Sequence, residues 1–393
     1  MTRTKQHRRK LQQGFTLLEM MVALTMGAIV VATVFTVGAS SARHFQEQQR
    51  ISQLQLSVRL ALDRVRRDAQ RAGFHGVANS RTAPSCGLNP PAPGVRGVAV
   101  TDHNPATSAA LATMPGWNAT VSHGDQLSLS GNFRTGDNYL VREWNGLTLE
   151  LQTQWQGYQR SFTADPNGDA IDADLAQRTF AAGTTLMIRA GGGQRIWAES
   201  TGATANTMGT TMTINTAPGF PADCRGQPGI EGWCQSGCTV APVTRVDYEI
   251  LEAPVTPGIT ASNALIAGAN TALMRTERNA ITGAIIGTPI RILDYAVHFD
   301  VDVVSNIAAA NLPQLLQLQD DAASTVASNI LPENTRALRI SLAARTPEQD
   351  EHLTSGVANL ADGTPRVFPV FVRPGAARVR SAYTEVFLPN LAL

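Results

Sequence analysis

Residues 14–39, "GFTLLEMMVALTMGAIVVATVFTVGA", form a long apolar run in which Glu19 is the single charged side chain. The 20 residues from Met20 to Ala39 carry no charge. At about 1.5 Å per residue, a helix of that length spans roughly 30 Å, the thickness of a bilayer's hydrocarbon core. The stretch therefore predicts a hydrophobic transmembrane or filament-core helix over residues 15–43.

Residues 1–14 form a short basic leader ahead of this helix. The leader contains five basic residues and no acidic residue. The basic residues are Arg3, Lys5, Arg8, Arg9 and Lys10. Positive charge before an apolar span places the N-terminus in the cytoplasm and the chain beyond the span in the periplasm. The whole chain has a formal charge of only +1, so the remainder is slightly acidic. That balance gives no indication of a general nucleic-acid-binding surface on the rest of the protein.

Residues 44–73 continue the helix as an amphipathic half. Apolar residues recur at steps of three and four and mark one face: Ile51, Leu54, Val58, Ala61 and Val65. Asp63 with Arg67, and Arg64 with Asp68, have the i, i+4 spacing that supports a helix. Gly73 is a plausible stop. We expect one helix over residues 15–72, whose second half packs on a globular domain.

The charge of Glu19 is energetically unfavourable inside a membrane anchor unless the carboxylate pairs with a cation. Cleavage after Gly14 would give Phe15 a free α-amine, about one helical turn from Glu19. A buried ion pair is tolerated where a lone charge is not. We expect Glu19 to be poorly satisfied in the waiting subunit and better satisfied beside an amine, its own or a neighbour's.

The order of leader, Gly-Phe-Thr-Leu-Leu-Glu and apolar helix resembles the signal of type IV prepilins and type II secretion pseudopilins. The resemblance implies cleavage after Gly14 by a prepilin peptidase and N-methylation of Phe15. It also implies that Glu19 guides docking into a helical filament. Many major pilins carry a helix-breaking proline near the position of Thr36. This chain has none, so helix melting on assembly is not implied.

Later segments are similar to PilW-type minor pilins. They include "RRDAQRAGFHG" at residues 66–76, "TRVDYEILEA" from Thr244 and the late strand "RVRSAYTEVFLPN". The resemblance implies a subunit stored in the inner membrane and then moved into the pilus, at or near its tip, where it helps to start assembly. Implied partners are other minor pilins, the major pilin, the prepilin peptidase and the inner-membrane assembly platform. No cofactor, small-molecule substrate or nucleic acid is implied.

Residues 77–393 predict a β-rich periplasmic head with a loop-rich insertion at about 155–243. Short β-branched or aromatic runs are bounded by Gly, Pro, Asn or Asp. The candidate strands are Gln126–Ser130, Tyr139–Glu143, Leu147–Thr153, Thr185–Arg189, Met212–Asn215, Thr244–Leu251, Ala272–Thr276, Ile290–Val304, Ala337–Ala343 and Val367–Val372. Residues 306–329 predict helix or loop. The fold class is therefore α+β, a long helix packed on a mostly antiparallel sheet.

Four cysteines follow the span: Cys86, Cys224, Cys234 and Cys238. An oxidising compartment favours two disulfides, and four cysteines allow three pairings that the sequence leaves open. The clustering of the last three favours one local bridge. A zinc site is disfavoured because the spacing lacks close ligand pairs.

An acidic turn, "DPNGDAIDAD", is the weak candidate for a metal. Asp165, Asn167 and Asp169 alternate as calcium ligands would, and Asp172 and Asp174 follow. The glycine is misplaced for an EF-hand, and Ala176 stands where a bidentate Glu is needed. A solvated acidic turn is the favoured interpretation, with no metal bound.

No nucleophile elbow, P-loop, dinucleotide motif or metal-binding histidine pair occurs, so the sequence predicts a protein that is not an enzyme. Arginines that alternate with apolar residues near the C-terminus favour the charged solvent side of an edge strand. Two alternatives to a pilus subunit stay open: a minor pseudopilin of a type II secretion system, and an adhesin or DNA-binding module displayed on a pilus. An ordinary signal-anchored periplasmic protein is a third, and it predicts no cut after Gly14.

Overall fold

A computed structural model describes residues 16–76, 85–86, 96–101, 124–144, 147–162, 172–189, 195–205, 212–216, 237–252, 271–307, 315–319, 335–347, 367–369 and 376–391. The chain divides into two units, Met1–Gln53 and Leu54–Leu393. The predicted leader, residues 1–14, and Phe15 lie outside the described residues.

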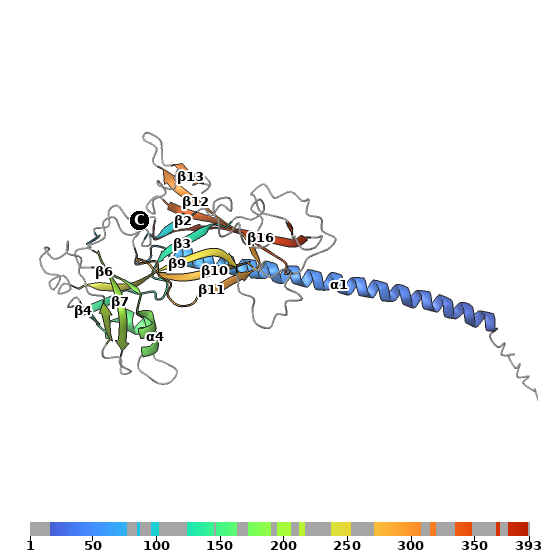
Figure 1. The fold of residues 1–393 in the computed structure, drawn as a ribbon, viewed down its shortest axis with the longest axis horizontal. Helices are drawn as coiled ribbons and strands as arrows, with labels where there is room; N and C mark the ends of the chain where they lie inside the picture. The colour runs from blue at the N-terminus through green and yellow to red at the C-terminus, as the bar shows by residue number, and fades with distance from the viewer. Residues whose placement is uncertain are drawn as a thin grey trace, which may run out of the picture. The chain divides into compact units, whose positions relative to one another are not determined.

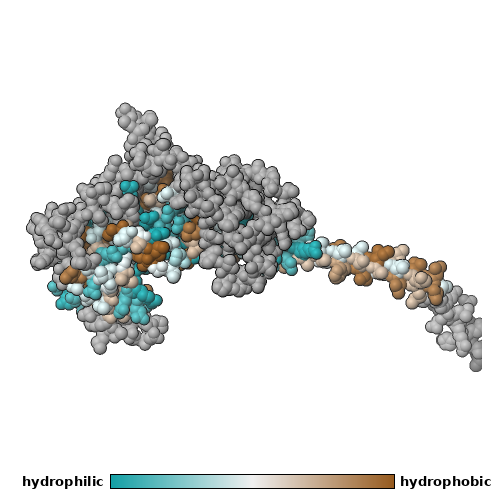
Figure 2. All heavy atoms as spheres, in the orientation of Figure 1, coloured by the Kyte–Doolittle hydropathy of each residue, from teal (hydrophilic) through white to brown (hydrophobic). Residues whose placement is uncertain are grey.

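Helix α1 (Leu17–Gln70) confirms the long N-terminal helix. Up to Gln53, almost all of its described side chains are exposed, including Leu24, Ile29 and Phe35. Figure 2 shows apolar side chains gathered along this part of the helix. By length and composition, α1 is the one helix in the described part of the chain that suits a membrane crossing.

The end of α1 is fixed by a turn that only a glycine adopts easily. Gly73 has a φ of 74°, in the left-handed region, and its N–H donates to the Ser130 carbonyl at 2.8 Å. The side-chain amide of Asn390 donates to the Gln70 carbonyl at 3.0 Å, which satisfies a carbonyl left unpaired at the end of the helix. The prediction that the helix stops at Gly73 is confirmed.

Two sheets make up the head (Figure 1). The 11-stranded sheet has the order β1-β7-β8-β5-β4-β9-β10-β11, with β2, β3 and β6 branching from it. Its strands are β1 (Ser85–Cys86), β2 (Val98–Thr101), β3 (Gln126–Gly131), β4 (Tyr139–Trp144), β5 (Thr148–Leu151), β6 (Thr185–Arg189), β7 (Arg195–Ala205), β8 (Met212–Thr216), β9 (Thr239–Glu252), β10 (Thr271–Asn279) and β11 (Ile290–Asp294). The short helices α3 (Gln156–Ser161) and α4 (Ala173–Thr179) lie between β5 and β6 in the chain.

The second sheet has five strands in the order β13-β12-β14-β16-β15. They are β12 (Ala296–Ile307), β13 (Leu315–Gln319), β14 (Thr335–Arg345), β15 (Val367–Pro369) and β16 (Ala376–Phe387). All its pairings are antiparallel, and in the larger sheet β1 with β7 is the parallel exception among the described strands. The α+β prediction is confirmed, with two sheets instead of the single sheet expected.

The principal core joins the C-terminal part of α1 to both sheets. Leu54, Val58, Ala61 and Val65 are buried, as the apolar periodicity predicts. They cluster with side chains from β2, β3, β9, β10 and β11 on the larger sheet and from β12, β14 and β16 on the smaller one. Burying apolar surface at roughly 25 cal/mol per Å² is what holds this half of the helix on the head.

A second core lies at the other end of β9. It is built around aromatic residues, with Tyr139 stacked on Phe162 at 5.4 Å and edge-on to Phe180 at 5.4 Å. Strand β9 contributes Val240 to this core and Val246 to the principal core, so one strand runs through both. The predicted insertion at 155–243 supplies α3, α4 and β6–β8 here, together with β4 and β5 that precede it.

Two expectations about elements are wrong, and one strand was not predicted. Residues 315–319 form strand β13, which pairs with β12, where helix or loop was expected. Strand β7 pairs with β6 and β8, in a region predicted to be loop-rich. The arginine-bearing strand β14 is not at an edge, because it lies between β12 and β16, and its Arg345 is buried.

Candidate functional site

The first turn of α1 is the candidate site that the sequence singles out. Thr16 precedes the helix, and its N–H and hydroxyl donate to Glu19 Oε2 at 2.9 and 3.1 Å. In return, the Glu19 N–H donates to the Thr16 hydroxyl at 3.3 Å. This reciprocal arrangement is a capping box, which satisfies N–H groups left unpaired at the start of a helix.

Glu19 therefore has partners within its own helix. The expectation that it is poorly satisfied in the isolated subunit is wrong, because the Thr16 backbone and side chain both bind its carboxylate. The negative charge also lies at the positive end of the helix dipole. The pattern Thr-x-x-Glu before an apolar run is the sequence signal for this cap. Gly14 and Phe15 lie outside the described residues.

A second charged site joins the other end of α1 to the head. Arg275 on β10 donates through Nε to Asp68 Oδ2 at 2.7 Å, and the Tyr248 hydroxyl donates to the same oxygen at 2.7 Å. The Arg275 and Asp68 side chains are only 3% and 9% exposed. Burial raises the pKa of Tyr248, and the neighbouring Asp68 charge raises it further. Burial lowers the pKa of Arg275, but the Asp68 charge and the hydrogen bonds to Glu277 and Asp68 together outweigh it, so the net shift is upward.

The expected helix pair between Arg64 and Asp68 is thus replaced by a long-range one. The other expected pair is confirmed, since Arg67 lies 2.8 Å from Asp63 on the exposed side of α1. Arg275 also binds Glu277 at 2.7 Å. The buried charges are paired, and Asp68 holds the helix in place on β9 and β10.

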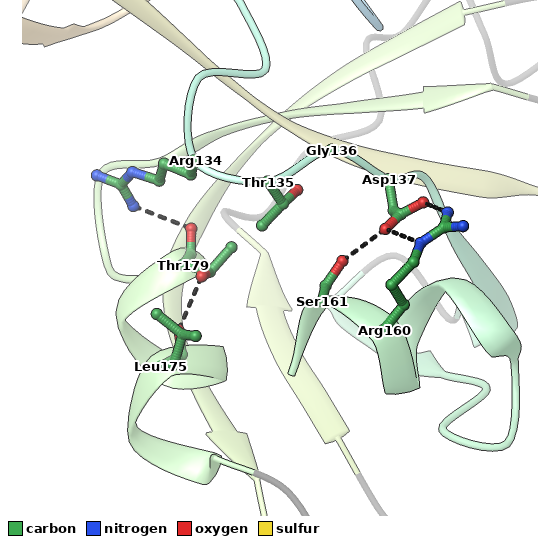
Figure 3. Close-up of a pocket in the computed structure, with 8 residues that line it drawn as sticks. All are labelled: Arg134, Thr135, Gly136, Asp137, Arg160, Ser161, Leu175 and Thr179. Carbon is green, nitrogen blue, oxygen red and sulfur yellow. Dashed lines mark hydrogen bonds and ion pairs between the residues drawn. The ribbon is translucent and has the colours of Figure 1, made fainter. Parts of the chain in front are cut away.

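A hollow of about 420 Å³ opens in the head beside the 134–137 loop (Figure 3). On one side, Arg160 donates from Nε to Asp137 at 3.2 Å and from a terminal nitrogen to the other carboxylate oxygen, while the Ser161 hydroxyl donates to Asp137 at 2.8 Å. The hydrogen bond from Arg160 holds the pKa of Asp137 below its usual range. On the other side, Arg134 and Thr179 face the hollow.

The cations of this pocket are already used by the protein. Arg134 donates to the carbonyls of Arg178 and Thr179, both at 2.9 Å, and so caps the end of helix α4. It also lies 3.6 Å from Glu277. Burial lowers the pKa of Arg134. The pairing of both arginines favours a structural role for the pocket.

The remaining sequence candidates are only partly described. Cys238 is buried in the second core; Cys224, Cys234 and the side chain of Cys86 lie outside the described residues, so the disulfides stay a prediction. Of the acidic turn, Asp165, Asn167 and Asp169 lie outside them too. Asp172 is the N-cap of α4, accepting from the Leu175 N–H at 2.7 Å. Within the described residues no group of three or more potential ligands is placed to hold a metal ion.

Comparison with known proteins bears on the N-terminal site. Residues 9–35 match the model of the prokaryotic N-terminal methylation motif. The matched range contains Gly14, Phe15 and Glu19 and the start of the apolar helix. The chain therefore carries a prepilin-like signal on a helix that is long and apolar enough to cross a membrane.

Comparison with solved structures gives a weaker match. A type IV-like pilin from Thermus thermophilus is similar at 16% identity and a TM-score of 0.20, covering 56% of this chain and 93% of that one. An overlap of this size does not establish a shared fold. No curated protein sequence matches the chain.

Proposed function

We propose that this protein is a minor pilin of the PilW type, a membrane-stored subunit that enters a type IV pilus and helps to start its assembly. The observation that carries the proposal is the methylation motif over residues 9–35, on a capped apolar helix whose C-terminal part packs on a β-rich head. Pilus-dependent motility or adhesion would follow from assembly. The role is structural, with no catalysis.

The proposed mechanism starts with processing. A prepilin peptidase cuts after Gly14 and methylates Phe15, while the basic leader stays cytoplasmic and the head is periplasmic. The subunit then docks through its exposed apolar helix face into the filament. Glu19 exchanges its Thr16 partners for the Phe15 amine of its own or a neighbouring chain. The exchange is favourable only if the ion pair with the amine is stronger than the two hydrogen bonds from Thr16 that it replaces.

A position at or near the tip is the finer part of the proposal. The chain is 393 residues long, and the described head carries two sheets and a second core. A head of that size would crowd its neighbours in a regular array, which favours a capping position. Proposed partners are other minor pilins, the major pilin, the peptidase and the inner-membrane platform.

Incorporation into sheared filaments tests the proposal. Glu19→Ala should still be cleaved after Gly14 but should be depleted from filaments, because the docking charge is gone. Asp63→Ala is the matched control, since it removes an exposed acid of the same helix. Normal incorporation of Glu19→Ala would contradict the role given to Glu19. Stoichiometric wild-type protein along the shaft would contradict the tip position.

A minor pseudopilin of a type II secretion system is the second candidate, because it shares the whole N-terminal argument. A deletion strain separates the two. Loss of twitching motility supports the pilus, and loss of exoprotein secretion supports the secretion system.

A further inference from the structure

Strand β16 is paired along only one of its two edges. Strand β14 pairs with it continuously from Ala337↔Phe387 to Arg345↔Val379. On the other edge, β15 pairs only with residues 376–378. Among the described residues, the second edge of β16 from 379 to 387 has no partner strand.

Two flanking hydrogen bonds show which groups point to the open edge. The Leu388 N–H donates to the Arg336 carbonyl at 3.0 Å, and the Thr346 N–H donates to the Arg378 carbonyl at 2.8 Å. Hydrogen-bonded and non-bonded pairs alternate in an antiparallel ladder, so even-numbered residues of β16 bond to β14. The N–H and C=O groups of Ser381, Tyr383, Glu385 and Phe387 therefore point to the open edge.

The side chains of these residues are also exposed. Tyr383 is 71% and Phe387 is 69% exposed, although both are large aromatic groups. Arg339 of the neighbouring strand lies over the Tyr383 ring at 5.5 Å from its centroid. Glu385 is exposed, and Arg339 of β14 lies directly opposite it in the register.

Natural edge strands are usually protected against pairing by charged side chains (lysine above all), proline, a bulge, an inward charge or a covering loop. On this edge Glu385 is the single charged side chain. Residues 381–387, "SAYTEVF", contain neither lysine nor proline. Their register with β14 has no shift. Alternating exposed aromatic groups beside unpaired backbone groups are the features that strand-adding partners use for specificity and affinity.

We propose that the open edge of β16, residues 381–387, is an interaction surface that takes one extended strand of a neighbouring subunit. The main-chain groups of the partner strand pair with those of Ser381, Tyr383, Glu385 and Phe387. The partner strand has apolar side chains beside Tyr383 and Phe387 and one basic side chain beside Glu385. Charge selects this partner over a second copy of the same edge, which brings another Glu385. The identity of the partner as a filament neighbour rests on the proposed function.

Proline substitution in the full-length protein tests the claim. Glu385→Pro removes an N–H that points to the open edge, so it should melt within a few degrees of wild type. Thr384→Pro removes an N–H that bonds β14 and should melt far lower, which checks the register. Glu385→Ala is the matched control that keeps the N–H. We expect filament content to fall at least about tenfold with Glu385→Pro and much less with Glu385→Ala.

Amide hydrogen exchange gives the second readout. In the detergent-solubilised subunit, the amides of Tyr383 and Glu385 should exchange fast and that of Thr384 slowly. In filaments all three should be slow. Fast exchange at residues 383 and 385 in filaments, or wild-type incorporation of Glu385→Pro, would overturn the proposal. If the wild type forms a dimer in detergent and Glu385→Pro abolishes that dimer, the partner strand belongs to a second copy of this chain, which contradicts the proposed partner.

The failure of the proposed function would look different. Wild-type protein absent from filaments would contradict the pilus role alone. The edge is then judged in native membranes, where protection of the Tyr383 and Glu385 amides relative to the purified subunit supports the partner strand. Equal exchange of these amides in membranes and in the purified subunit would overturn the edge proposal in addition to the pilus role.

Discussion

Arg275 and Asp68, 207 residues apart in the chain, meet at 2.7 Å in the buried interior of the head. The pair joins the last turns of α1 to β10, and the Tyr248 hydroxyl from β9 completes it. A buried charge that loses its partner is left uncompensated, whereas an exposed pair contributes little. The attachment of the helix to the head therefore depends on this site as well as on apolar packing.

We expect Asp68→Ala to lower the free energy of unfolding by about 3–5 kcal/mol, because Arg275 then stays buried without its main partner. Asp63→Ala, on the exposed face of the same helix, should cost only about 0.5 kcal/mol. Urea unfolding of both variants in detergent, followed by tryptophan fluorescence, measures the difference. Equal losses would show that the buried pair has no special role.

Gly131 lies where the end of β3 approaches the end of α1. A Cβ atom at this position would lie 2.8 Å from the Arg71 carbonyl oxygen and 3.4 Å from the Gly73 nitrogen, both backbone atoms that cannot rotate away. Gly131→Ala should therefore destabilise the protein by about 1–3 kcal/mol, the range for overpacking.

The matched control is Gly136→Ala, because an added Cβ there meets no atom within 4 Å. This change should be neutral or stabilise slightly through the unfolded chain. Thermal melts compare the two variants. Equal melting temperatures for Gly131→Ala and Gly136→Ala would mean that the end of α1 is not held closely against β3.

His75 makes stability depend on pH. Burial lowers its pKa, against the opposing effects of the Asp137 charge and of a hydrogen bond that the imidazole donates to the Gly136 carbonyl. In the window between the folded pKa and the unfolded value of about 6.5, the unfolded chain binds more protons. The contribution of His75 to stability is therefore present above pH 6.5 and is lost as the pH falls through that window.

The variant His75→Asn tests this contribution. Asparagine tolerates the φ of 51° at residue 75, so it removes the titration without forcing the backbone. Acidification from about pH 7 to pH 5 should lower the melting temperature of the wild type more than that of His75→Asn. Parallel curves would contradict the assigned shift.

Thr16 should control how firmly α1 begins. Thr16→Ala removes the hydroxyl that accepts from the Glu19 N–H and donates to its carboxylate, at a cost of about 0.5–2 kcal/mol of local helix stability. Thr16→Ser keeps both bonds. In micelles, the amide of Glu19 should exchange faster in Thr16→Ala than in wild type or Thr16→Ser. Unchanged exchange would mean that the cap is not formed there.

The sequence alone predicts the elements with strong local patterns. The apolar steps from Leu54 to Val65 predict the packed face of α1, and Gly73 predicts its end, because periodicity and turn chemistry are local properties. The true partner of Asp68 could not be found this way: Arg64 has the right local spacing, and Arg275 becomes a neighbour only when β10 is in place. Strand β7 was missed because its pairing with β6 and β8 outweighs its weak β propensity.

The first turn of α1 and the open edge of β16 differ in the same respect. Thr16 and Glu19 form a local motif that the sequence displays openly as Thr-x-x-Glu. The open edge of β16 depends on which strands lie beside it, and the alternation in "SAYTEVF" does not tell an edge strand from a central one.

Mass spectrometry of the mature N-terminus shows whether the chain is processed as a prepilin. The protein is purified from membranes of a host that has a prepilin peptidase. We expect a chain that begins at N-methylated Phe15, with residues 1–14 removed. A chain that keeps its basic leader, or one that is cut after the apolar helix, would contradict this expectation.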